Sequence, residues 1–145
     1  LGSSLAWATY LKKKGHSVTV VTPSDYPAFL NWMQGNDEVV IYEPRQNDRQ
    51  VRDLVNRAEL IFCLDFNCLG RINELGEYVR RAPGLKILID HHQRPEQFAD
   101  LSYSNMQAAA TADGDAPAPQ PAATARSGPA GVDLHVLVEA HGARV

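Results

Sequence analysis

Apolar runs alternate with amphipathic stretches along residues 1–107. Runs of apolar and β-branched residues bounded by turn residues predict strands at 18–22, 38–43, 60–65 and 86–90. The stretches between them carry apolar residues at helical spacing and predict helices at 3–14, 27–33, 47–58 and 72–81. Strands separated by helices imply βαβ units, so the pattern predicts an α/β fold: a parallel sheet with helices on both faces.

The first predicted helix is bounded by residues typical of helix ends. Ser3 or Ser4 can cap its N-terminus, and Gly15 suits the position after its last turn. The backbone N–H groups at such a helix start can hold a phosphate, which makes Ser3 a candidate substrate-binding residue. The alternative is an ordinary helix cap without a ligand.

The composition changes at residue 108. Residues 108–131 are rich in Ala, Pro and Gly and contain no large aliphatic or aromatic residue. Such a segment buries too little apolar surface to offset its ordering entropy. We therefore expect a structured domain at 1–107 and a disordered, low-complexity tail at 108–145. The tail is either a flexible linker or the product of an altered reading frame.

Two features inside the tail have the pattern of structured sequence. Apolar residues alternate over 132–138, which suits a short strand, but no partner strand is evident for it. Asp113 and Asp115 have the spacing of a metal-binding pair. No strand precedes them and Pro117 follows, so we interpret them as part of the unstructured segment.

Composition and charge exclude several classes of protein. The formal net charge is -3, so the chain has no basic field for non-specific nucleic-acid binding. No apolar run approaches the ~20 residues of a membrane-spanning helix, so we expect no membrane association. The two cysteines, Cys63 and Cys68, are too few for a disulfide scaffold or a four-thiolate zinc site. They suit a reduced compartment, so we expect a cytoplasmic protein.

Candidate chemistry collects where two predicted strands end. Asp65 closes one apolar run, and Asp90, His91 and His92 close another. The carboxyl ends of parallel strands are where α/β proteins bind ligands, and carboxylates with imidazoles suit Mn²⁺, Fe²⁺ or Zn²⁺. The alternative is a solvated loop with two adjacent histidines. Arg94 follows closely and could bind a phosphate, or could be an ordinary surface residue.

Several motifs in order and spacing resemble the DHH family of phosphoesterases. They are GSSLA (2–6), YLKKKGH (10–16), VVTPSDYPAFLNWM (20–33), FCLDFN (62–67), GRINELG (70–76) and LIDHH (88–92). Together they cover residues 1–107 and are most similar to the branch of bifunctional oligoribonucleases and 3′-phosphoadenosine 5′-phosphate (PAP) phosphatases.

The resemblance implies a role for each matching residue. Asp65 and His91 match metal ligands, whereas His92 matches a catalytic phosphate-facing residue that Asp90 supports. The family uses two Mn²⁺ ions to hydrolyse phosphoester bonds with an activated water. The branch implies short RNA or PAP as substrate, and we expect no membrane partner and a homodimer.

Parts of the family pattern have no counterpart in this sequence. The family carries a His and an Asp-x-Asp pair just before the position of Leu1, a later metal-binding Asp, and a second domain with a Gly-Gly-Gly-His motif. We therefore expect a piece of a longer enzyme that is inactive or weak by itself. The alternatives are a non-catalytic remnant and a generic nucleotide-binding α/β domain, although the sequence shows no Gly-rich phosphate loop after the first strand.

Overall fold

Six parallel strands form one sheet in a computed structural model that describes residues 1–104 and 134–139. The order across the sheet is β2-β1-β6-β3-β4-β5, and every neighbouring pair is parallel. The strands are β1 (Ser17–Thr22), β2 (Val40–Ile41), β3 (Leu60–Leu64), β4 (Leu85–Asp90), β5 (Leu101–Ser104) and β6 (Leu134–Glu139).

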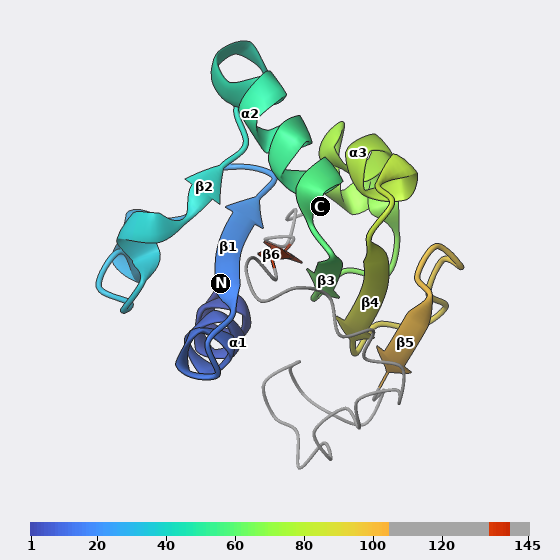
Figure 1. Cartoon of the computed structure of the whole chain (residues 1–145), viewed down its shortest axis with the longest axis horizontal. Coiled ribbons are helices and arrows are strands. Elements are labelled where there is room, and N and C mark those ends of the chain that lie inside the picture. Colours follow the sequence, from blue (N-terminus) through green and yellow to red (C-terminus); the bar gives the residue numbers. More distant parts are fainter. Residues whose placement is uncertain (105–133, 140–145) are drawn as a thin grey trace.

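Helices cover both faces of this sheet, which confirms the predicted fold class (Figure 1). The α-helices are α1 (Gly2–Lys13), α2 (Pro44–Arg57) and α3 (Leu75–Arg81), and short 3₁₀ helices span Ala28–Leu30, Asn36–Glu38 and Leu69–Ile72. No helix in the described part of the chain is long and apolar enough to cross a bilayer.

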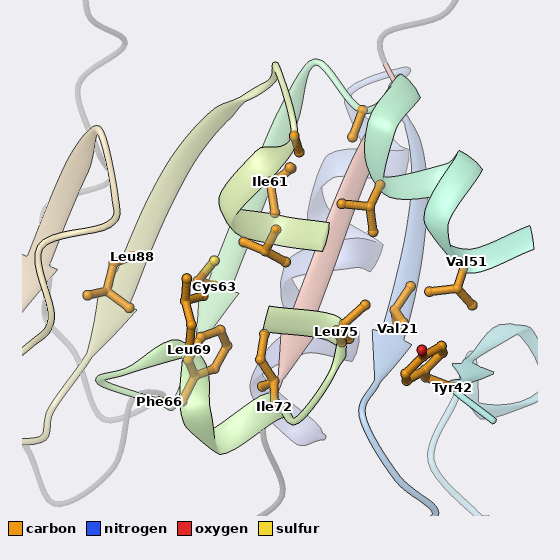
Figure 2. Packing of buried hydrophobic residues seen from close by; sticks show 14 residues of the cluster. Val21, Tyr42, Val51, Ile61, Cys63, Phe66, Leu69, Ile72, Leu75 and Leu88 are labelled. Atoms are coloured by element: carbon orange, nitrogen blue, oxygen red, sulfur yellow. The ribbon is translucent and has the colours of Figure 1, made fainter. Parts of the chain in front are cut away.

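Alternate residues of the strands supply two separate hydrophobic cores. On one face, Ile61 and Cys63 of β3 pack with residues of α2, α3 and the 3₁₀ helix that precedes α3 (Figure 2). On the other face, Phe62 and Leu64 pack with the apolar side of α1. Because strand side chains alternate between faces, one apolar run at 60–64 builds both cores and fixes β3 between the two helical layers.

β6 lies in the interior of the sheet, between β1 and β3, which differs from the sequence prediction. The alternating pattern at 132–138 predicted a strand with no partner, yet β6 pairs with β1 on one side and with β3 on the other. Ser17 aligns with Leu134, and Leu64 aligns with Glu139. The rest of the predicted tail, including Asp113 and Asp115, lies outside the described residues.

Several predicted elements have different bounds in the structure. The strand predicted at 38–43 shrinks to two residues, because it pairs only with β1 and Pro44 then begins α2. The helix predicted at 72–81 starts later, at Leu75, since Asn73 adopts a left-handed φ of 53°. The predicted Ser cap is wrong: Leu1 is the N-cap, and the buried Ser4 hydroxyl donates to the Leu1 carbonyl at 3.0 Å.

We predict that Leu137→Pro destabilises the whole domain. Leu137 pairs with Val20 on one side and Phe62 on the other, and proline can neither donate a ladder hydrogen bond nor fit a central strand. We expect a loss of about 3 kcal/mol or more in the free energy of unfolding, measured by urea denaturation. Leu137→Ile keeps the backbone donor and serves as the control. Equal stability of the two variants would contradict the central placement of β6.

Candidate metal centre

Parallel pairing of β3 with β4 brings four polar side chains to one edge of the sheet. Leu64 aligns with Ile89, so the next residues, Asp65 and Asp90, emerge at the same level. The Asp65 backbone N–H donates to the Ile89 carbonyl at 3.1 Å, which extends the pairing one residue beyond β3. The sequence prediction that these strand ends share one edge therefore agrees with the structure.

Asp65 has an unusual backbone conformation. Its φ is 63°, in the left-handed region that few residues other than glycine adopt, although Asp is among those that tolerate it. The conformation ends β3 and turns the chain sharply. The Asp65 side chain consequently lies beside the residues that follow β4, with Oδ1 3.2 Å from His91 Nδ1.

Asp90 and His92 form a second pair. Asp90 is only 3% exposed, and its Oδ1 lies 2.6 Å from His92 Nδ1. The other oxygen, Oδ2, accepts the His92 backbone N–H at 3.1 Å. This contact occupies Nδ1 of the His92 ring, so Nε2 is the ring nitrogen that can meet a ligand.

The two pairs form one compact cluster. One ligand atom from each of Asp65, Asp90, His91 and His92 lies within 4.8 Å of the others, and the two imidazole rings stack with centroids 4.4 Å apart. Carboxylate oxygens and imidazole nitrogens are donors for Mn²⁺, Fe²⁺ and Zn²⁺. All four residues are partly or fully buried at this edge. The cluster thus has the composition and the size of a divalent-metal site.

Cys63 lies close to the cluster in sequence but has no ligand character. Its side chain points from β3 into the core and is fully buried, and burial raises the pKa of its thiol to about 12. A thiol that stays protonated is a poor metal ligand and a poor nucleophile. The oxygen and nitrogen atoms of the cluster are therefore the relevant donors.

The two predicted substrate-binding residues lie outside the four-residue cluster. Arg94 is exposed two residues after His92, with a left-handed φ of 54°. Ser3 lies in the first turn of α1 and is half-buried. Sequence reasoning also overlooked Asn67 and Glu96, which join the loops that follow β3 and β4. Their partners are 26 and 27 residues away along the chain, so local spacing gave no signal for them.

A comparison with known protein families identifies the family of this chain. The sequence profile of the DHH family, N-terminal domain, matches residues 1–114, which include the whole cluster. The chain belongs to the DHH family. The comparison with curated proteins gives no significant match.

One solved structure shares much of this DHH domain. It is an exopolyphosphatase-related protein from Bacteroides fragilis, 27% identical over the aligned region, with a TM-score of 0.61. The alignment covers 66% of this chain and 36% of that protein's chain. The present chain therefore spans little more than a third of that relative.

We predict that Asp90 sets the tautomer of the His92 ring. In alkaline buffer, where imidazoles are neutral, ¹⁵N NMR should show His92 protonated at Nδ1. Asp90→Ala removes a charged acceptor worth about 1.5 kcal/mol, so the tautomer ratio should shift by about tenfold toward Nε2–H. Asp53→Ala, which removes an exposed carboxylate on α2, should leave the signal unchanged. A His92 ring protonated at Nε2 in the unmodified chain would contradict this role.

Proposed function

We propose that this DHH chain is the metal-binding part of a phosphoesterase. The observation that carries the proposal is the 3.2 Å contact between Asp65 Oδ1 and His91 Nδ1, which joins an oxygen and a nitrogen donor from two strand ends. Family membership supports the same interpretation, because the matched region contains both residues. Asp65 and His91 would hold the ion, and we propose Mn²⁺ as that ion.

Asp90 and His92 are the proposed catalytic pair. In the hydrolysis, water adds to phosphorus, the P–O ester bond breaks, and the leaving oxygen takes a proton. With Nδ1 directed at Asp90, His92 Nε2 can hold a proton next to a phosphate oxygen. A bound divalent cation supplies Lewis-acid stabilisation of the phosphoryl oxygens and lowers the pKa of water. Arg94 and Ser3 are proposed contacts for the substrate phosphate.

The proposed substrates are short oligoribonucleotides and PAP, as the resemblance of the sequence motifs implies. Polyphosphate is the second candidate, favoured by the name of the structurally similar exopolyphosphatase-related protein. Asp65 and His91 supply only some of the ligands that a site for two ions needs, so we expect weak activity from this chain by itself. The homodimer and the cytoplasmic location stay predictions.

We predict that Mn²⁺ stabilises the chain through Asp65 and His91. A ligand at 100 times its Kd adds about 2.7 kcal/mol to the free energy of unfolding, which raises the Tm by several degrees. Asp65→Asn and His91→Ala should remove most of this gain in calorimetry. Asp53→Asn makes the same chemical change at an exposed position of α2 and should retain the gain. No Mn²⁺-dependent rise in the unmodified chain would contradict the proposed metal site.

We predict slow, Mn²⁺-dependent release of mononucleotide or phosphate, measured with a short oligoribonucleotide, PAP and polyphosphate in parallel. Asp90→Asn should lower the rate on the order of 10²-fold, because it weakens the support of a proton-transferring imidazole. Asp100→Asn, on an exposed carboxylate before β5, is the matched control. Hydrolysis that persists in excess chelator would refute the metal requirement. Preferential cleavage of polyphosphate would select the second substrate class.

A further inference from the structure

We propose that Asn67 and Glu96 are positioning residues that set the distance between Asp65 and His91. They join two segments, here named the β3 loop (residues 65–69) and the β4 loop (residues 91–96). The inference rests on the proposed function, since its purpose is to hold two metal ligands in place. Neither residue belongs to the cluster of candidate ligands.

Two hydrogen bonds connect Asn67 directly to the β4 loop. The Asn67 side-chain Nδ2 donates to the Gln93 carbonyl at 2.9 Å, and the Glu96 backbone N–H donates to the Asn67 carbonyl at 2.7 Å. Asn67 comes two residues after Asp65, and Gln93 comes two residues after His91. The two ligands are therefore each separated by one residue from a cross-link between the loops.

The Glu96 side chain ties this cross-link to the rigid part of the domain. Its Oε2 accepts the Leu69 backbone N–H at 2.9 Å, and its Oε1 accepts from Arg80 Nη2 of α3 at 2.6 Å. Two hydrogen bonds lower the pKa of Glu96: the bond from Arg80 has the larger effect and the bond from the Leu69 N–H the smaller one. The carboxylate therefore stays charged at neutral pH. Leu69 is buried, which anchors this end in the core.

A ring contact adds an apolar link between the same regions. Phe66 of the β3 loop is fully buried, and its ring stacks on Phe98 at a centroid distance of 6.2 Å with planes 4° apart. Phe98 lies just after the β4 loop and packs against the core. The loops are thus held by polar bonds at their exposed side and by an aromatic pair beneath.

This arrangement matters because the strands themselves fix only the start of each loop. Asp65 already lies outside β3 in a left-handed conformation, and His91 lies outside β4. Ligand groups must be held to within about 0.5 Å for a metal site to form, and supporting residues affect metal affinity by about 10- to 100-fold. Loss of the cross-link would let the two ligands separate while both strands stay paired.

The test compares Asn67→Ala, Glu96→Ala and Glu96→Gln with the unmodified chain. Glu96→Gln keeps an acceptor for the Leu69 N–H but loses the charge that pairs with Arg80. Glu77→Gln is the matched control, because Glu77 also pairs with Arg80, at 3.6 Å, without touching either loop. Mn²⁺ affinity is measured by electron paramagnetic resonance of the free ion. NMR of the metal-free chains reports the contact of His91 Nδ1 with Asp65.

We expect Asn67→Ala and Glu96→Ala to weaken Mn²⁺ binding by about tenfold, with Glu96→Gln intermediate and Glu77→Gln unchanged. The His91 Nδ1 resonance of the metal-free chain should shift in the same order. Affinities equal to that of the Glu77→Gln control would overturn the positioning role and leave the proposed metal site intact. If the unmodified chain binds no Mn²⁺, the proposed function fails. The NMR then decides the positioning role alone, and an unchanged His91 resonance in all variants overturns it.

Discussion

The register between β3 and β4 is the constraint on which the candidate metal centre depends. Parallel pairing of Leu64 with Ile89 puts Asp65 level with Asp90, and the residues that follow converge from there. A shift of one residue would turn every side chain of β3 to the opposite face and exchange the two core layers. The apolar packing that holds this register therefore also determines which carboxylates and imidazoles meet. Stability of the fold and geometry of the site have the same origin in this domain.

Local signals were sufficient to predict the fold class and the four cluster residues. The run at 60–65 is apolar because β3 is covered on both faces, and Asp65 stands out at its end for that reason. Asp90 follows an apolar run in the same way. Parallel strands end at a common edge, so two strand-terminal carboxylates in one sequence already imply proximity. Their individual pairings, Asp65 with His91 and Asp90 with His92, depend on backbone angles after the strands, and no sequence pattern reports those angles.

The features that the sequence did not predict are defined by contacts in the folded chain. β5 is a short edge strand of four residues, too few for their apolar–polar alternation to stand out, and its pairing with β4 defines it. The pattern at 132–138 did predict a strand, but its neighbours in sequence gave no indication of its place between β1 and β3. The sequence carries no signal for Asn67 and Glu96, because their hydrogen bonds join loops that are adjacent only in the folded sheet.

The place of β6 has a consequence for how this domain acquires its structure. Among the strands that the structure describes, β6 in the middle of the sheet comes last in sequence, and its neighbour β1 comes first. Contacts between distant parts of a chain form slowly, because closing a long loop costs entropy before any pairing repays it. A ribosome releases β6 only after every other described strand has been made. Until then β1 and β3 present unpaired edges, and a chaperone that shields such edges would be needed most during that interval.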